Sequence, residues 1–193
     1  MAKTKWLVDP AHSEVQFKVK HLMITTVTGY FRKFNLEVES EDADFNKVSK
    51  ILFTANIDSI DTNNAQRDTH LKSEDFFAAE KHGQLKFEGK DFSKKGDKYE
   101  LKGDLTIRNI TKPIVVEAEY AGTVVDPYGQ TKAGFTADGK INRKDFDLKW
   151  DAVTEAGQVV VSNEIRFHCE LQLIKQVATT QVAGKKTENK VEA

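Results

Sequence analysis

The chain has 193 residues, 39% of them hydrophobic and 31% charged, which is the composition of one ordinary globular domain. Its formal net charge of −1 gives no overall field that would favour nucleic acid or an anionic membrane as a partner, and we expect no nucleic acid partner. No apolar run approaches the roughly 18 residues of a membrane-spanning helix, so we expect no stable membrane insertion. The first residues lack the apolar stretch of a secretory leader, and we therefore expect a cytoplasmic location.

Apolar and polar residues alternate at every second position through most of the chain, which predicts strands with one apolar face. In chain order the predicted strands span 15–21, 34–39, 53–57, 85–90, 100–107, 114–120, 135–141 and 161–173. Eight such strands can close into a barrel that holds one small ligand. We predict an all-β protein, an extended eight-stranded antiparallel lipocalin-like barrel. A two-sheet sandwich is the structural alternative.

The predicted connections are unequal in length. Those near 40–46, 93–98 and 125–130 are typical of short turns, whereas those near 22–28, 60–82 and 143–158 are longer. A short capped helix is predicted within 63–72, over one end of the barrel. If the strands run up and down, every long connection lies at the same end, which we call the mouth.

The periodic pattern ends before the chain does. We predict that residues 1–175 form the barrel domain and that 176–193 form a disordered tail, because this last segment is polar and lacks apolar periodicity. The single cysteine, Cys169, cannot form an internal disulfide, so we expect burial to stabilise the fold.

Polar residues at the predicted mouth form the candidate headgroup site. His21 is in phase with the inward face of its strand, and the same argument applies to Arg32, Arg143 and Asn163. Two further residues lie three apart on one face of the predicted helix. We predict that a ligand headgroup binds this set: His21, Arg32, Arg67, His70, Arg143 and Asn163.

The same residues allow a structural interpretation. A charge that points into an apolar barrel is costly unless it is paired or bound. The arginines therefore either hold a polar or anionic headgroup, or carboxylates and loop carbonyls satisfy them and they merely plug the end. The residue pattern leaves both alternatives open.

The inward apolar residues define the candidate tail site, which consists of Phe17, Val19, Phe53, Ile57, Phe87, Leu105, Phe135 and Phe167. Small inward residues such as Ala55, Ala137 and Gly139 indicate that side chains do not fill the bore completely. Small residues also suit the taper of a packed barrel, but we favour a tunnel that accepts one long apolar ligand.

Motifs of common enzymes are missing from the sequence. There is no Gly-x-Ser-x-Gly turn, no phosphate-binding glycine loop and no His-Glu-x-x-His. Five histidines without ligand spacing and one cysteine do not predict a metal site. We expect a protein that is not an enzyme, with no catalytic residue, metal or cofactor. The alternatives are an enzyme that acts on a prenyl or fatty-acyl compound near His21 and His70, and a ligand-free interaction module.

Several stretches, in order, resemble one known family: WLVDPAHS at 6–13, VQFKVKHLM at 15–23, GYF at 29–31, RDTHLKSEDFF at 67–77, LTIRNITKP at 105–113 and INRKDF at 141–146. Together they resemble the YceI-like family of bacterial lipocalin-like proteins, from about Trp6 to Leu173. The resemblance implies an extended eight-stranded barrel that binds polyisoprenoid lipids, with quinones or fatty-acid derivatives as other occupants. We predict that the protein binds such a lipid, a polyprenyl phosphate, a polyprenyl pyrophosphate or a quinone, as a carrier or storage protein. The sequence leaves a homodimer open.

Overall fold

The computed structural model describes residues 3–41, 45–155, 157 and 159–176. The strands are β1 (Thr4–Val8), β2 (Glu14–His21), β3 (Thr25–Phe31), β4 (Phe34–Ser40), β5 (Val48–Asn56), β6 (Ile60–Asp61), β7 (Gln84–Lys95), β8 (Lys98–Ile107), β9 (Ile110–Val125), β10 (Thr131–Asn142) and β11 (Val161–Lys175). A helix, α1 (Ala65–Lys72), and three 3-10 turns, η1 (Pro10–His12), η2 (Ile57–Ser59) and η3 (Arg143–Phe146), complete the described elements.

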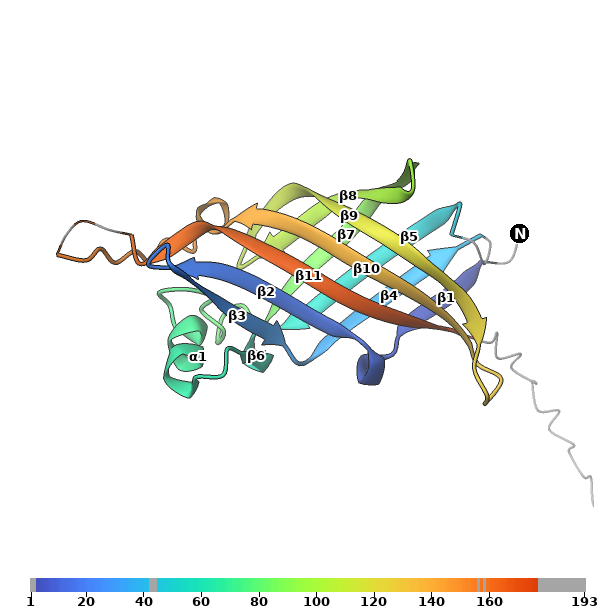
Figure 1. The fold of residues 1–193 in the computed structure, drawn as a ribbon, viewed down its shortest axis with the longest axis horizontal. Coiled ribbons are helices and arrows are strands. Elements are labelled where there is room, and N and C mark those ends of the chain that lie inside the picture. Colours follow the sequence, from blue (N-terminus) through green and yellow to red (C-terminus); the bar gives the residue numbers. More distant parts are fainter. Residues whose placement is uncertain (1–2, 42–44, 156, 158, 177–193) are drawn as a thin grey trace, which may run out of the picture.

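The strands form one long antiparallel barrel (Figure 1). Within the described residues the sheet order is β1-β4-β5-β7-β8-β9-β10-β11-β2-β3-β6, and β1 also pairs with β11. That additional pairing closes a ring of eight strands, because it joins the first strand in this order to the eighth. The predicted eight-stranded barrel is therefore confirmed, and the sandwich alternative is wrong.

β1 and β2 are two halves of one wall strand. Both pair antiparallel with β11, β2 along its first part and β1 along its last residues. The turn η1 separates the halves, and it starts at Pro10, where the missing backbone N–H ends the ladder. β3 and β4 divide the next wall strand in the same way, because β3 pairs with β2 and β4 pairs with β1.

Two predicted segments differ in how well they match the structure. Residues 22–28 are not a long loop, because β3 already begins at Thr25. Threonines fill much of this strand and Gly29 takes an inward position, so the apolar alternation that predicts a strand is missing. The predicted helix is confirmed as α1, whose cap Asn64 accepts a hydrogen bond from the backbone of Arg67 at 2.9 Å. None of the described helices is long and apolar enough to cross a membrane.

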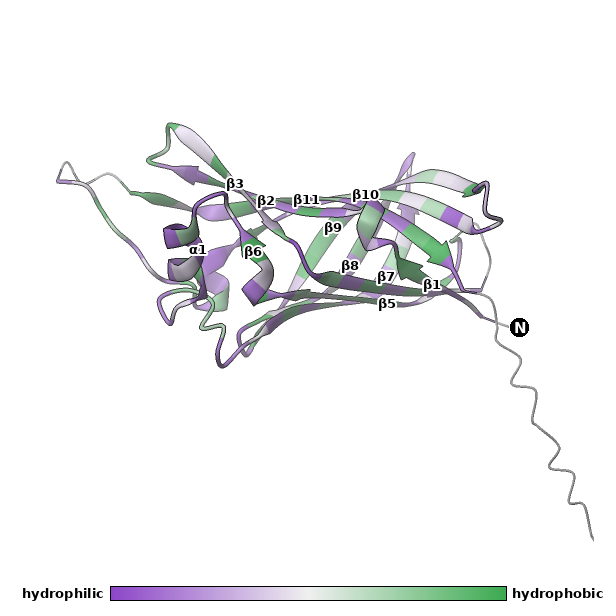
Figure 2. Ribbon diagram, turned by 90° about the horizontal axis from the view of Figure 1, so that it is seen from below, coloured by the Kyte–Doolittle hydropathy of each residue, from purple (hydrophilic) through white to green (hydrophobic). Residues whose placement is uncertain are grey.

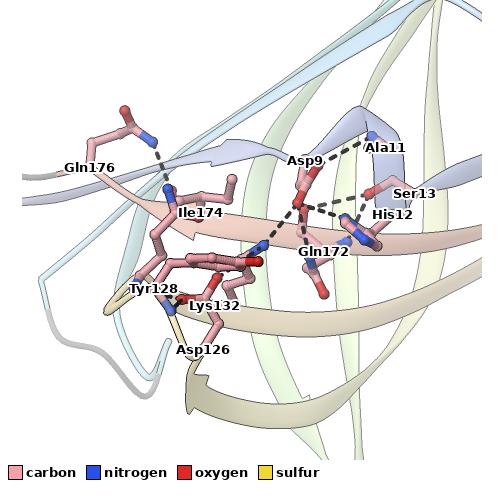
Figure 3. A network of polar contacts seen from close by, with 11 residues as sticks. Asp9, Ala11, His12, Ser13, Asp126, Tyr128, Lys132, Gln172, Ile174 and Gln176 are labelled. Atoms are coloured by element: carbon pink, nitrogen blue, oxygen red, sulfur yellow. Dashed lines mark hydrogen bonds and ion pairs between the residues drawn. The ribbon is translucent and has the colours of Figure 1, made fainter.

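The closed end of the barrel lies opposite the mouth. Phe45, in the β4–β5 connection, is almost fully buried there, and its ring centroid lies 4.9 Å from those of both Trp6 and Phe135. A polar network also joins the wall segments at this end of the barrel (Figure 3). The carboxylate of Asp9 accepts hydrogen bonds from Lys132 at 3.1 Å and Gln172 at 3.0 Å. The closed end is thus both plugged and cross-linked.

The mouth gathers the connections that follow β2, β5, β8 and β10, while α1 and β6 lie against one side of the barrel near it (Figures 1 and 2). The prediction that the long connections at 60–82 and 143–158 share one end is confirmed. The predicted tail at 176–193 lies outside the described residues except for Gln176, whose backbone N–H donates to the carbonyl of Lys5 at 2.8 Å.

Candidate ligand-binding site

A cavity of about 410 Å³ lies inside the barrel. Its lining reaches from Phe45 at the closed end to His70 and Trp150 at the mouth, and it is aliphatic or aromatic along most of that length. Small-molecule sites in proteins typically have volumes of roughly 300–1,000 Å³. The interior is therefore large enough for a ligand and suits an apolar one.

The apolar set predicted for a ligand tail lies almost entirely on this cavity. Seven of its members line the space: Phe17, Val19, Phe53, Phe87, Leu105, Phe135 and Phe167. Ile57 does not, so its predicted inward position in the bore is wrong. Strand phase no longer applies to it because β5 ends at Asn56, and Ile57 packs in the core from the turn η2.

Three phenylalanine rings cover glycines of neighbouring strands. A Cβ atom built on these glycines would lie 2.2–2.4 Å from the Cζ atom of a ring, and the pairs are Phe17 with Gly29, Phe87 with Gly103 and Phe167 with Gly139. The small size of these glycines suggests that they open the bore, but the rings that cover them occupy that space. The glycines let large rings lie against the wall instead of across the bore, which keeps the cavity open.

Charged lining residues are confined to the mouth half of the cavity. Four of the predicted headgroup residues are among the lining residues, namely His21, Arg67, His70 and Arg143. Lys20 and Thr62 also line the cavity, although neither was predicted to do so. Lys20 alternates with the inward residues Val19 and His21, so its pattern is that of an outward residue. Thr62 follows a strand of only two residues, which has no readable period.

Hydrogen bonds hold the side chain of Arg67 in place, while one of its N–H groups has no partner among the described residues. Its Nε donates to Oγ1 of Thr62 at 2.8 Å, and its Nη2 donates to the Thr62 carbonyl at 2.7 Å. Thr62 is buried and is held in turn by Asp68, whose Oδ1 lies 2.9 Å from its backbone N. The Nη1 group of Arg67 has no hydrogen-bond partner among the described residues, so this guanidinium retains donors of the kind that bind anions.

The two histidines that line the cavity, His21 and His70, differ in their contacts within the protein. Nε2 of His70 lies 2.9 Å from Oδ2 of Asp75, and its ring packs edge-on against Phe76 and Trp150 at 5.1 and 5.2 Å. The side chain of His21 makes no hydrogen bond to any residue that the structure describes, which leaves its ring nitrogens available to a ligand.

Arg143 points inward and lines the cavity, but the protein uses all five of its N–H groups. It is 2% exposed, and its acceptors at 2.5–3.4 Å are the carbonyls of Leu148, Trp150, Val161 and Ser162 and the carboxylate of Asp151. Lys144 and then Arg143 lower the pKa of that carboxyl by hydrogen bonding to it. The structural alternative, a plug held by loop carbonyls, therefore describes Arg143.

The predicted inward orientation of Arg32 and Asn163 is wrong. Arg32 is exposed between β3 and β4, where it bonds Asp61 at 2.8–2.9 Å and lies over the ring of Tyr30. It falls outside both strands, so strand phase does not set its direction. Asn163 is exposed because the pairing of β11 with β2 shifts register between Val161 and Ile165. Neither residue lines the cavity.

Comparison with known proteins identifies the family. The model of the YceI-like domain matches residues 6–173. The chain belongs to the YceI-like family. A UPF0312 protein of Photorhabdus laumondii is 40% identical over 142 residues, which is 72% of each chain. The family resemblance seen in the sequence motifs is thereby confirmed.

Two solved structures share the YceI-like barrel. The crystal structure of a YCEI protein from Campylobacter jejuni aligns with a TM-score of 0.70 and 31% identity, over 82% of this chain and 90% of that chain. A polyisoprenoid binding domain from Saccharophagus degradans aligns with a TM-score of 0.63, over 89% of this chain and 98% of that one. At 11% identity, the second likeness shows the fold alone.

Proposed function

We propose that this YceI-like protein binds one long isoprenoid-type lipid in its barrel and serves as a carrier or storage protein. The observation that carries the proposal is the cavity, apolar from Phe45 upward and charged only toward the mouth. Such a space would bury an extended hydrocarbon tail, which gains free energy in proportion to the apolar area removed from water. The polyisoprenoid binding domain of the same fold supports the isoprenoid class.

The proposed headgroup position is the mouth, beside Lys20, His21, Arg67 and His70. Arg67 offers its free Nη1 group, and His21 and Lys20 have no side-chain partner among the described residues. A polyprenyl phosphate or pyrophosphate would take charge-assisted hydrogen bonds from these donors, and a quinone would take neutral ones. In this proposal Arg143 does not touch the headgroup, because it holds the loop that frames the mouth.

Binding is proposed in preference to catalysis. Cys169 lines the cavity, but burial raises its pKa to about 12, so the thiol stays protonated and is a poor nucleophile at neutral pH. The cavity volume also speaks against a ligand-free interaction module, whose interior would be packed with side chains. The cytoplasmic location expected from the sequence stays a prediction.

Mass spectrometry of an organic extract from the purified protein tests the proposal. We expect a prenyl lipid or quinone at up to one molecule per barrel. The variant Ala137→Glu puts an unpaired carboxylate into the cavity lining and should lower the lipid content strongly, whereas Ala121→Glu, on the exposed face of β9, should not. Extracts without any long apolar molecule, or equal lipid contents in both variants, would contradict the proposal.

A further inference from the structure

The β2–β3 turn exposes large apolar side chains at the mouth. Leu22 and Met23 both have positive φ angles, 50° and 59°, and the N–H of Ile24 bonds to the carbonyl of His21 at 3.1 Å. Left-handed backbone at both central residues of a hairpin turn normally selects Asn and Gly. Here Met23 is 60% exposed and Ile24 78% exposed. Backbone strain and exposed apolar surface thus coincide at one site, which is characteristic of functional positions.

A second exposed apolar segment lies beside this turn. The backbone N–H of Leu22 donates to the carbonyl of Val160 at 2.8 Å, which joins the turn to the β10–β11 connection. In that connection, Val153 and Val159 face each other in an isolated bridge, and both are exposed. Val160 itself lines the cavity. The exposed apolar residues are therefore continuous with the cavity lining, at the end where both segments project from the barrel (Figure 1).

The outer wall next to the turn is cationic. Lys140, Arg166 and Lys18 lie side by side across β10, β11 and β2, and Lys20, which is exposed at the rim and also borders the cavity, follows toward the mouth. Glu164 pairs with Arg166 at 2.8 Å and with Lys140 at 3.3 Å. Lys18 and Lys20 form no ion pair in the part of the chain that the structure describes. The exposed apolar side chains of the β2–β3 turn thus lie beside lysines without an ion-pair partner, a combination that complements an anionic lipid surface.

We propose that the mouth docks onto an anionic phospholipid bilayer. Met23 and Ile24 would enter the boundary between headgroups and acyl chains, where apolar side chains gain free energy, while Lys18 and Lys20 would face the lipid phosphates. This orientation sets the cavity mouth against the bilayer, so a lipid tail passes between membrane and barrel without crossing water. Lipid transfer between membrane and barrel rests on the proposed function, whereas docking can be measured with protein that holds no lipid.

Co-sedimentation with vesicles tests the docking. The vesicles contain phosphatidylcholine alone or phosphatidylcholine with phosphatidylglycerol. We expect the double variant Met23→Ser/Ile24→Ser to partition onto anionic vesicles roughly tenfold or more weakly than the unchanged protein. Val124→Ser/Val125→Ser is the matched control, because these valines are 65% and 67% exposed near the closed end. It should bind as the unchanged protein does.

The charge component has its own pair of variants. Lys18→Glu/Lys20→Glu should weaken binding to the anionic vesicles and leave the weaker binding to neutral vesicles unchanged. Lys94→Glu/Lys95→Glu changes two exposed lysines on β7 at the closed end and should have little effect. Equal losses in both variants would show that overall charge, and not the mouth, governs binding, which would overturn the proposal.

A third variant separates docking from folding. Leu22→Asn/Met23→Gly fits the left-handed turn better, so it should raise the melting temperature and still reduce docking. Unchanged vesicle binding by this variant and by Met23→Ser/Ile24→Ser would overturn the proposal. If the turn variants altered only the oligomeric state, the proposal would also be overturned, because the exposed turn would then contact a second copy of the protein. Vesicle binding by protein that extracts no lipid would support docking and contradict the lipid-binding function instead.

Discussion

The closed end and the mouth satisfy their polar groups in opposite ways. At the closed end, Asp9 accepts hydrogen bonds from His12, Lys132 and Gln172 at 2.9–3.1 Å, and its partners come from three parts of the wall (Figure 3). At the mouth, His21 and Lys20 have no side-chain partner among the described residues. The closed end is therefore cross-linked by its polar groups, while the mouth leaves these two side chains without a partner among the described residues.

The two tryptophans make the same contrast. Trp6 is fully buried at the closed end, and its Nε1 donates to Oγ of Ser40 at 3.1 Å. Trp150 is only partly buried at the mouth, where it packs on His70 and lines the cavity. Residues of one type thus support the fold at one end and shape the site at the other.

Truncating the two tryptophans should separate stability from binding most strongly. We expect Trp6→Ala to lose about 3–5 kcal/mol of unfolding free energy, because it leaves a large cavity in a closed core. Trp150→Ala should lose less, about 1–2 kcal/mol, and should weaken lipid binding. Urea denaturation of lipid-free protein and a lipid titration measure both effects. Equal losses of unfolding free energy in the two variants would contradict the view that the closed end supports the fold more than the mouth does.

Replacing Arg143 tests whether it belongs to the fold or to the ligand. Arg143→Lys removes most of its hydrogen bonds to buried carbonyls, so we expect about 2–4 kcal/mol of lost stability with little change in lipid affinity. The exposed arginines Arg32 and Arg166 are controls, and their Lys variants should keep both properties. A drop in lipid affinity without a loss of stability would return Arg143 to the headgroup site.

For Arg67 we expect the opposite of Arg143, a loss of lipid affinity that is larger than the loss of stability. Arg67→Gln keeps a polar side chain but loses the charge and the free Nη1 donor, so affinity for a polyprenyl phosphate should fall roughly tenfold or more. Affinity for the corresponding neutral prenyl alcohol should change less. Calorimetric titration of both ligands measures the difference. Parallel losses for the two ligands would mean that Arg67 shapes the mouth without contacting the headgroup.

Asp9 predicts a pH dependence that belongs to the closed end. Burial raises its pKa, but hydrogen bonds from His12, Lys132 and Gln172 outweigh that effect and lower it from 3.8 to about 2. A lowered folded-state pKa adds stability above the unfolded-state value and loses it as the pH falls. For a side chain that is 11% exposed, the shift corresponds to about 2 kcal/mol, lost between about pH 4 and pH 2.

Asp9→Asn isolates this contribution. The variant should be less stable than the unchanged protein at pH 7, and the difference should shrink below pH 4 as Asp9 becomes protonated in the unchanged protein. Lipid affinity at pH 7 should stay the same, because Asp9 does not line the cavity. A difference in stability that stays constant from pH 7 to pH 2 would contradict the network as its source.

Strand periodicity was enough to predict most of the barrel wall, because one buried face forces alternation at every second residue. It failed where another residue took over the inward position, as at Gly29, whose place the ring of Phe17 fills. Phase was also lost where a strand ends or shifts register, and this misplaced Ile57, Arg32 and Asn163.

The site was less predictable than the wall because its chemistry depends on contacts between distant segments. The sequence placed Arg143 inward correctly, but whether its donors were free depended on the carbonyls of the β10–β11 connection. The role of Thr62 as the anchor of Arg67 follows from α1 folding back onto the segment after β6, and no local pattern indicates it.

We propose that one lipid lies in the bore with its head at the mouth and its tail toward the closed end. Photo-crosslinking tests this orientation with two polyprenyl phosphates, one bearing a diazirine beside the phosphate and the other bearing it at the tail end. We predict that the first labels peptides containing His21 or Arg67 and that the second labels peptides containing Phe45 or Phe135. The reverse assignment, or labelling confined to the outer wall, would contradict this orientation.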